Sequence, residues 1–402
     1  CRINSTSMFA RKHSFYPDLP KGYQITQHSQ PLAQAGRVDI GTTQVAIARL
    51  HIEEDAGRSV HTPKSTLVDY NRSGIPLAEI VTEPCLTSPA QAREFLEVLK
   101  SLLEYTGVSD CKMEEGSLRC DANISLQGQA GTGARTEIKN LNSFRAVEKA
   151  LAYEVRRQGQ LLEQGEEVLP QTLRWDEAGD QTVAMRTKEQ ASDYLYLTEP
   201  DLPPLILDEA AIQRAANLPE LPLARKARWL KEYNLPSANA DILIRNRTLA
   251  SWFDRMMAAG AEPHLAANWL LGEVSRLLKE AKQDDPPFSP ADLVRLIELN
   301  QRGGISEASA KDVLARMFES GRTPEEIVQR LDLGQISAKD ELEELVRQVV
   351  ASNPDAVQDF QSGKERALKF LLGQGMKLSL GKANPHILRE MMVKALNNAG
   401  NH

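Results

Sequence analysis

The sequence lacks the features that would place it in a membrane or outside the cell. No stretch approaches the ~18 uncharged residues that a membrane-spanning helix needs. The first 21 residues carry four Lys or Arg without the apolar core of a signal peptide. Only four of the 402 residues are cysteines, and no two of them have the Cys-x-x-Cys spacing of zinc and redox sites. These absences favour a protein of the reducing cytoplasm.

Single-motif enzyme signatures are also missing. The sequence contains no P-loop, Gly-x-Gly-x-x-Gly, His-Glu-x-x-His or nucleophile-elbow motif. Any chemistry must therefore depend on residues that the fold brings together from separate segments. The chain begins at Cys1 rather than at Met, so we expect it to be a fragment whose N-terminal segment is missing.

The C-terminal end of the chain is basic, although the net charge of the whole chain is −7. The last 42 residues contain seven Lys or Arg and two Glu, which gives +5 there and −12 in the rest of the chain. Arg366, Lys369 and Lys377 fall at helical spacing around Gly373, and Lys382 and Arg389 flank a predicted helix start. These five cations are candidates for binding a nucleic-acid backbone, and from the pattern alone an ordinary solvated face remains the alternative.

Hydrophobic periodicity divides the chain. At 402 residues it is too long for one compact core. Up to about residue 220 the patterns alternate between strand and helix, and beyond it they are helical. We therefore predict an α+β fold with domains at 1–220, 221–335 and 336–402. In the first domain we expect helices that open at Ser88 and Ser143, and strands or hairpins over 45–52, 65–83, 117–126, 135–139 and 173–186.

Two segments of the first domain are rich in carboxylates. They are residues 49–55 (RLHIEED) and 76–83 (PLAEIVTE), and in the second Glu79 shares a strand face with apolar neighbours. Asp121 and Asn123 lie on the polar face of the predicted 117–126 strand. Oxygen ligands from several strands suit Mg²⁺ shared with phosphates. The alternative is a wet face where these acids pair with Arg119 and Lys139.

Two histidines stand near these carboxylates. His51 and His61 are candidate ligands or bases, but a single His beside a strand is more often structural. The sequence assigns a role to neither.

Several ordered blocks resemble one family, the B subunits of aspartyl/glutamyl-tRNA amidotransferase. The resemblance covers essentially the whole chain. The blocks are residues 15–24 (FYPDLPKGYQ), 49–57 (RLHIEEDAG), 69–77 (DYNRSGIPL), 112–123 (KMEEGSLRCDAN), 137–144 (EIKNLNSF), 268–269 (NW) and 381–385 (GKANP).

The resemblance implies a heterotrimer with an A subunit, which releases ammonia from glutamine, and a C subunit, which holds A and B together. In this family it is the B subunit that binds Glu-tRNA(Gln) or Asp-tRNA(Asn) and uses Mg²⁺ and ATP to phosphorylate the misattached side-chain carboxylate. Ammonia then displaces the phosphate. The implied fold is a cradle domain related to glutamine synthetase, then a helical domain and a small helical tail that binds the tRNA.

The resemblance also implies roles for single residues. Glu54 and Glu79 match metal-site positions, Asp121 lines the same pocket, and Lys12 lies where ammonia enters. With these we predict that substrate or ATP contacts Asn123, Arg119, Lys139 and Arg186. The family's chain has a further metal-site Glu and His ahead of the position of Cys1, so we expect this 402-residue piece alone to lack phosphotransfer activity.

One stretch departs from the family pattern. Residues 193–201 read DYLYLTEPD, where relatives usually read Asp-Tyr-Arg-Tyr-Phe-Pro-Glu-Pro-Asp. If that Arg touches phosphate in relatives, Arg186 or Lys188 must replace it.

Two other functions remain open: a non-catalytic scaffold that binds tRNA, and a small-molecule ligase resembling glutamine synthetase.

Overall fold

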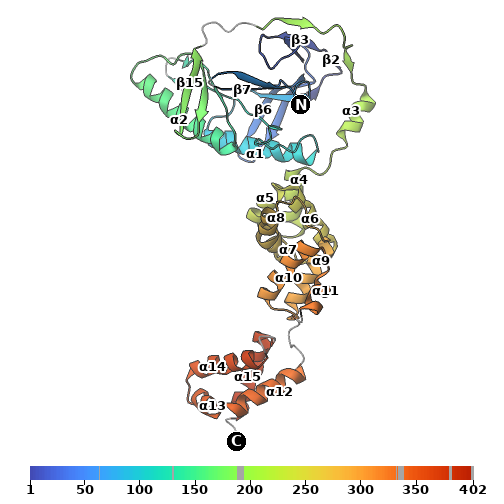
Figure 1. Cartoon of the computed structure of the whole chain (residues 1–402), viewed down its shortest axis with the longest axis vertical. Coiled ribbons are helices and arrows are strands. Elements are labelled where there is room, and N and C mark those ends of the chain that lie inside the picture. The colour runs from blue at the N-terminus through green and yellow to red at the C-terminus, as the bar shows by residue number, and fades with distance from the viewer. Residues whose placement is uncertain are drawn as a thin grey trace. The chain divides into compact units, whose positions relative to one another are not determined.

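The computed structural model describes residues 1–62, 64–128, 131–187, 194–331, 333, 339–379 and 383–399. Contacts divide the chain into two units, Cys1–Pro222 and Leu223–His402. The first combines sheets with helices and the second is helical where it is described (Figure 1). The chain is therefore α+β, as predicted. No described helix combines the length and apolar character needed to cross a bilayer.

Where it is described, the first unit contains three helices and a series of mostly short strands. The helices are α1 (Pro89–Tyr105), α2 (Phe144–Glu163) and α3 (Glu209–Ala216). The strands are β1 (Arg2–Ile3), β2 (Thr6–Ser7), β3 (Ala10–His13), β4 (Tyr23–Thr26), β5 (Ala33–Asp39), β6 (Gln44–Glu54), β7 (Arg58–His61), β8 (Thr66–Asp69), β9 (Pro76–Thr82), β10 (Ala122–Ile124), β11 (Gln127–Gly128), β12 (Gly131–Thr132), β13 (Thr136–Lys139), β14 (Gln171–Asp176), β15 (Gln181–Thr187), β16 (Tyr196–Thr198) and β17 (Leu205–Ile206).

Two four-stranded sheets dominate this unit. The first, here called the β6 sheet, has the order β1-β5-β6-β9, and the second, the β13 sheet, has the order β10-β13-β14-β15. All their neighbouring strands are antiparallel except β13 and β14, which are parallel. A three-stranded sheet has the order β16-β3-β4, and β17-β2, β7-β8 and β11-β12 are two-stranded.

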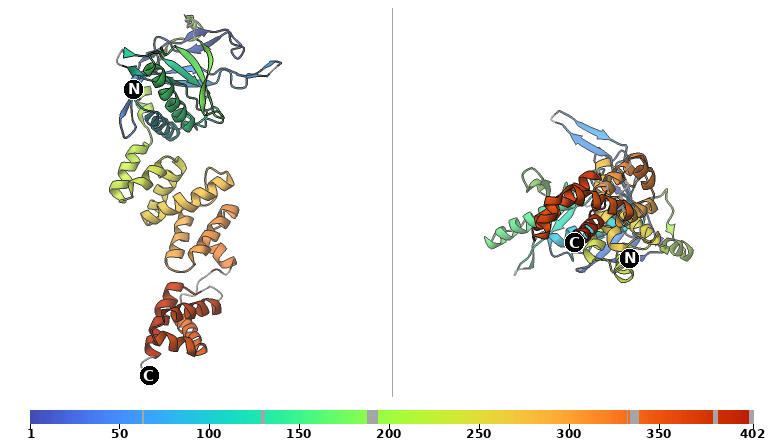
Figure 2. Two further views of the ribbon diagram at one scale, coloured as in Figure 1. Left: turned by 90° about the vertical axis from the view of Figure 1, so that its left-hand side faces the viewer. Right: turned by 90° about the horizontal axis from the view of Figure 1, so that it is seen from below.

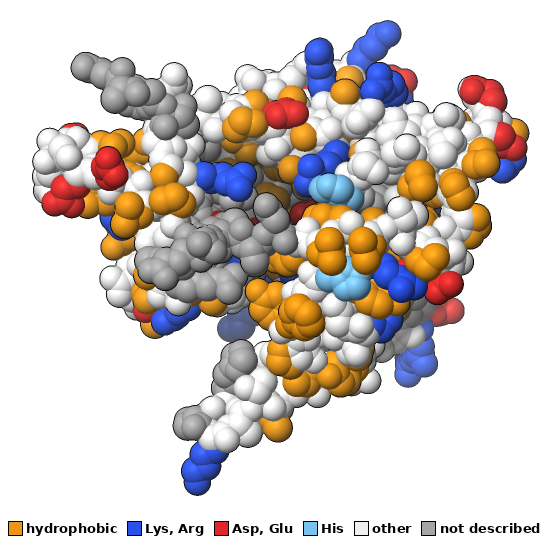
Figure 3. Space-filling model, turned by 90° about the horizontal axis from the view of Figure 1, so that it is seen from above, with side chains coloured by type: hydrophobic (Ala, Val, Ile, Leu, Met, Phe, Trp, Pro, Cys, Tyr) orange, Lys and Arg blue, Asp and Glu red, His pale blue; other side chains and the backbone are white. Residues whose placement is uncertain are grey.

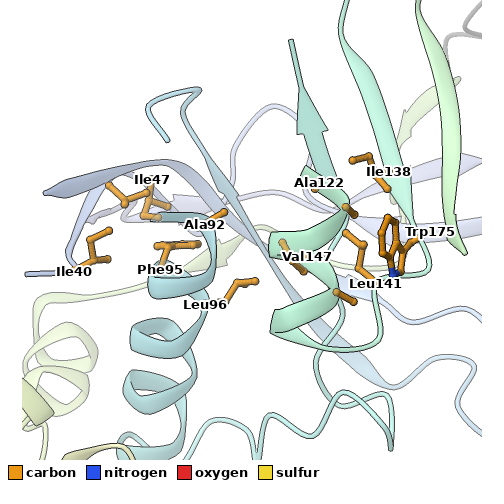
Figure 4. Close-up of a cluster of buried hydrophobic side chains, with 13 residues drawn as sticks. Ile40, Ile47, Ala92, Phe95, Leu96, Ala122, Ile138, Leu141, Val147 and Trp175 are labelled. Carbon is orange, nitrogen blue, oxygen red and sulfur yellow. The ribbon is translucent and has the colours of Figure 1, made fainter. Parts of the chain in front are cut away.

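Both large sheets pack on the same two helices. Ser88 and Ser143 cap α1 and α2, each accepting a hydrogen bond from a backbone N–H of the first turn. Figure 4 shows apolar side chains of both helices and both sheets converging on one core. Because neighbouring strand residues point to opposite faces, each sheet keeps a polar face on the side away from these helices.

A β-bulge decides which residues of β6 face the core. Ile47 is buried in the core, but the register against β9 shifts between Ile47 and Arg49. Beyond the shift Leu50 pairs with Ile80, which packs against the core. Alternation then places Arg49 and the odd-numbered residues that follow it on the polar face.

The second unit is built from helices around apolar cores. Helices α12 to α15 lie together (Figure 2) and share a core of their own, which includes Leu342, Leu371 and Leu388. The elements, which start at the unit boundary, are α4 (Pro222–Glu232), α5 (Ser237–Ile244), α6 (Arg247–Ala258), α7 (Pro263–Trp269), a π-helical turn (Leu270–Val274), α8 (Ser275–Ala281), α9 (Pro290–Gln301), α10 (Glu307–Ser320), α11 (Pro324–Arg330), α12 (Lys339–Ser352), α13 (Pro354–Gln361), α14 (Glu365–Leu378) and α15 (Pro385–Ala399).

Two local predictions differ from the structure. The expected 65–83 hairpin is wrong, because β8 pairs with β7 while β9 pairs with β6. The expected 117–126 strand is reduced to β10, Ala122–Ile124. Ahead of β10 the Ser117 hydroxyl binds the backbone of Lys112 and closes a turn, which keeps this segment out of the ladder.

Candidate functional site

Three titratable side chains meet on the polar face of the β6 sheet. His51 and Glu79 are direct partners across β6 and β9, and Glu53 is two residues along β6 on the same face. His51 Nε2 lies 2.7 Å from Glu79 Oε2 and 3.6 Å from Glu53 Oε2. One ligand atom of each residue lies within 4.8 Å of those of the other two. We call these three residues the acidic cluster.

The two carboxylates of the acidic cluster stabilise positive charge. Burial of the His51 ring disfavours its protonation, but Glu53 and Glu79 outweigh that effect and raise the pKa of His51 to about 9. The hydrogen bond from His51 lowers the pKa of Glu79 despite its burial, and the charges of Lys12 and Arg49 lower it further. The two carboxylates therefore favour the protonated form of the His51 imidazole.

This donor set fits a divalent cation. Two carboxylates supply the hard oxygen atoms that Mg²⁺ prefers, and the imidazole would add a nitrogen donor after losing the proton that they stabilise. Within the described part of the chain, His51 Nδ1 is buried without a hydrogen-bond partner. The structure thus offers ligands on one face of two adjacent strands.

Glu54, predicted to join Glu79 at a metal, does not meet it. Adjacent strand residues point to opposite faces, so Glu54 projects away from the acidic cluster. Its carboxylate pairs with Lys21 Nζ at 2.6 Å and accepts the backbone N–H of Ile25 at 3.2 Å. The structure brings Glu53 to Glu79 in its place, and the sequence analysis missed this residue.

The polar face of the β13 sheet holds a second group of charges. Lys139 Nζ lies 2.8 Å from Asp121 and 3.2 Å from Glu137, and Asn123 is the cross-strand partner of Glu137. Burial alone would lower the pKa of Lys139, but these two carboxylates outweigh it and raise the pKa. Three predicted residues therefore meet here, together with Glu137, which sequence reasoning had not singled out. The remaining prediction on this sheet, Arg186, pairs in register with Thr172 of β14.

A buried carboxylate connects the two polar faces. Asp55 follows β6 and is 6% exposed. It binds Arg119, in the segment that leads to β10, and lies 3.0 Å from Nε of Arg72. Arg119 was predicted to contact substrate, and the structure shows it held by Asp55.

Lys12 belongs to the three-stranded sheet. It lies on β3 opposite Tyr196 of β16, and its Nζ is 4.6 Å from the ring centroid of Tyr194. Its charge contributes to the lowered pKa of Glu79, so it lies near the acidic cluster. Figure 3 shows this unit from above the view of Figure 1, with basic side chains and histidines around a recess that also contains an acidic side chain.

The predicted basic surface lies on the last two helices. Arg366, Lys369 and Lys377 are exposed along α14, and Arg389 is exposed on α15. No atom lies within 4 Å of the position that a Cβ on Gly373 would take, so this part of α14 is open. The fifth predicted cation, Lys382, lies outside the described residues. We call the four described cations the basic surface.

The segment that departs from the family pattern is partly described. Leu197 lies on β16, where it pairs with Arg11, and Thr198 pairs with Ala10. Leu195 and Leu197 are 60% and 49% exposed. Lys188 and Asp193 lie outside the described residues.

Comparison with known proteins identifies both parts of the chain. Residues 1–213 match the GatB/GatE catalytic domain family, and residues 251–396 match the GatB domain family. Proteins named as the B subunits of aspartyl/glutamyl-tRNA(Asn/Gln) amidotransferase are similar over nearly the whole chain. The protein of Moorella thermoacetica is 47% identical over 98% of this chain and 86% of its own length. That of Carboxydothermus hydrogenoformans is 46% identical over 98% and 84%. The chain therefore belongs to the family of aspartyl/glutamyl-tRNA(Asn/Gln) amidotransferase B subunits.

Proposed function

We propose that this chain, within a glutamine-dependent amidotransferase, converts Glu-tRNA(Gln), Asp-tRNA(Asn) or both to the amidated forms. It phosphorylates the misattached side-chain carboxylate with ATP and then directs ammonia to it. The observation that carries this proposal is the pair of connected polar faces, one with the acidic cluster and the other with the Lys139 group. These faces support the proposal because one would hold a cation and the other an anion.

The chemistry requires both partial reactions. A carboxylate is a poor acyl donor because its oxygen is a poor leaving group. In the first reaction a carboxylate oxygen bonds to the γ-phosphorus while the bond to the bridging oxygen of ADP breaks. In the second the nitrogen of ammonia attacks the acyl carbon, phosphate leaves, and the nitrogen loses a proton. The acyl phosphate must be kept from water between the two.

The acidic cluster is proposed to hold Mg²⁺. Glu53 and Glu79 would be its carboxylate ligands, with His51 beside them. When bound, the ion neutralises the phosphate oxygens of ATP. The sequence analysis paired Glu54 with Glu79, and we propose that Glu54 instead orients Lys21 on the opposite face.

The β13 sheet is proposed to hold the reacting end of the tRNA. Lys139 is a cation already fixed by Asp121 and Glu137, so it can bind a carboxylate or phosphate without reorganising. Asn123 adds an amide next to Glu137, and Arg186 is proposed to contact substrate from β15. Lys12 is proposed to mark the place where ammonia enters, as the resemblance to the family implies.

The partners are also proposals. The A subunit would supply ammonia from glutamine, and the C subunit would hold A and B together. The exposed cations of α14 and α15 would bind the phosphate backbone of the tRNA.

The test is amide formation by the complex of the full-length chain with its A and C partners. Free ammonia is supplied with Mg²⁺, ATP and Glu-tRNA(Gln), so that the glutaminase is bypassed. Glu79→Gln should lower the rate by about 100-fold or more with unchanged tRNA affinity. The control is Glu94→Gln on α1, a carboxylate held by the Thr42 hydroxyl at 2.8 Å.

Two results would count against the proposal. A full rate in Glu79→Gln would remove the acidic cluster from the reaction. A wild-type complex that binds tRNA but forms no amide would favour the non-catalytic scaffold.

A further inference from the structure

Two arginines share one buried carboxylate next to the acidic cluster. Arg119 binds Asp55 Oδ1, and Nε of Arg72 lies 3.0 Å from Asp55 Oδ2. The backbone N–H of Ala56 also donates to Oδ1 at 2.8 Å. Two guanidinium charges therefore meet one carboxylate, which leaves a surplus of one positive charge.

The position of this group relates it to the acidic cluster. The backbone N–H of Asp55 donates to the carbonyl of Ile75 at 2.8 Å, so the antiparallel pairing with the β9 segment continues past Glu54. Alternation then places Asp55 on the same face as His51 and Glu53. Residues two apart on a strand are about 7 Å apart along it. Asp55 is two residues beyond Glu53, so the arginines that contact it lie next to the acidic cluster on the same face.

The two arginine side chains are fixed by contacts but remain partly exposed to solvent. The side chains of Arg119 and Arg72 are 47% and 33% exposed, while that of Asp55 is 7% exposed. Arg72 also donates to the carbonyl of Gly116 at 3.4 Å. A Cβ on Gly116 would meet the Arg72 guanidinium, so a larger residue there would require this side chain to move. The carboxylate fixes the guanidinium groups and leaves part of each accessible to an anion.

We propose that Arg72 and Arg119 bind the terminal phosphoryl group of the nucleotide beside the acidic cluster, with Asp55 as the residue that positions them. This inference rests on the proposed function and specifies which groups bind the phosphate. Guanidinium groups bind phosphate oxygens through paired N–H donors, and fixed donors stabilise charge without reorganisation. Because Arg119 leads into β10 and Asp55 directly follows β6, the bound phosphate lies where the two polar faces meet.

The test measures binding to the assembled complex by calorimetry with three probes: the non-hydrolysable analogue AMP-PNP with Mg²⁺, inorganic phosphate, and adenosine. Arg119→Ala should weaken AMP-PNP binding by about 10- to 100-fold and leave adenosine binding unchanged. Arg119→Lys, which keeps the charge without the paired donors, should give an intermediate loss. The control is Arg93→Ala, whose side chain is 46% exposed and pairs with Glu97 and Glu148 on the helical side.

Each other outcome overturns the inference. Unchanged AMP-PNP affinity in Arg119→Ala shows that this arginine does not hold phosphate. Equal losses for AMP-PNP and adenosine, with a lowered melting temperature, show a purely structural brace. A loss confined to inorganic phosphate assigns the site to a free anion rather than to the nucleotide. If the wild-type complex binds no AMP-PNP, the proposed function is contradicted as well. That result differs from unchanged affinity in Arg119→Ala, so a failure of the proposed function can be told apart from a failure of this inference alone.

Discussion

The two charged regions of this chain are built in opposite ways. In the first unit His51, Glu79 and Asp55 are held by partners from other strands or loops, and His51 and Asp55 are buried. On α14 and α15 the cations of the basic surface are exposed, and the described residues give them no ion pair. Fixed charges suit a reaction in which donors must already be in place. Exposed charges suit a phosphate backbone, where the number of contacts sets the affinity.

This difference separates chemistry from tRNA affinity. Substitutions on the polar faces should lower the rate at saturating tRNA, and substitutions on the basic surface should lower affinity. The predictions below test that separation in order of expected effect.

The largest effect is expected at Lys139. Lys139→Met removes the cation between Asp121 and Glu137 and should lower the rate of amide formation by about 100- to 1000-fold at saturating tRNA. The dissociation constant for tRNA should stay within about twofold, because this residue lies in the other unit from the basic surface. Single-turnover amide formation and filter binding measure the two quantities. A loss of tRNA affinity in Lys139→Met without a loss of rate would contradict the separation of chemistry from tRNA affinity.

A buried ion pair outside the polar faces should affect stability only. Glu154 on α2 is 0% exposed and accepts two hydrogen bonds of 2.8 Å from Arg157. Arg157→Met would leave this carboxylate buried without its charge partner and should destabilise the first unit by about 3 kcal/mol. The neighbouring exposed Arg156→Met is the control. Urea unfolding measures the difference, and an equal effect of both variants would contradict this account.

The same pair predicts a pH dependence. Burial would raise the pKa of Glu154, but hydrogen bonds from Arg157, Thr182 and Gln158 outweigh it and lower the pKa. Its contribution to stability is therefore complete above the ordinary glutamate pKa near 4.5 and is lost as the pH falls through the lowered value. In Arg157→Met the loss of stability should shrink from pH 7 to pH 4. A loss that grows toward acid would show that Arg157 does not stabilise the charged form.

The smallest effects are expected on the basic surface. Lys369→Ala and Lys377→Ala should each weaken tRNA binding a few-fold and reduce the slope of log K against log salt by about one unit. Lys364→Ala is the control, because that lysine in the same region is already paired with Asp359 at 2.7 Å. Binding is measured between 50 and 200 mM salt, a range of roughly fourfold over which phosphate contacts weaken strongly. Identical slopes in all three variants would remove these lysines from the interface.

Local signals predicted much of the fold. The caps at Ser88 and Ser143 mark the starts of α1 and α2, since capping depends only on neighbouring residues. The hairpin of β14 and β15 was also predicted, because its turn lies between two alternating segments. The 3, 4 and 4 spacing around Gly373 correctly indicated one exposed helix face.

The acidic cluster could be predicted only in part. The segments that supply it were singled out, but Glu54 was chosen where the structure brings Glu53 to Glu79. That choice depends on the bulge between Ile47 and Arg49, which reverses the faces of the rest of β6. A bulge of this kind is fixed by pairing with β9, and periodicity within one segment does not reveal it. The partner of β8 was missed for a similar reason, because strand pairing is a property of the whole sheet.

The most direct test compares the two adjacent glutamates. Transfer of labelled phosphate from ATP to Glu-tRNA(Gln) is measured without ammonia in complexes that carry Glu53→Gln or Glu54→Gln. The two substitutions are chemically identical and differ in the face of β6 that they change. The account predicts that Glu53→Gln lowers transfer by about 100-fold while Glu54→Gln keeps most of it, with equal tRNA affinity in both. Full transfer in Glu53→Gln, with loss in Glu54→Gln, would contradict the assignment of the acidic cluster as the phosphorylation site.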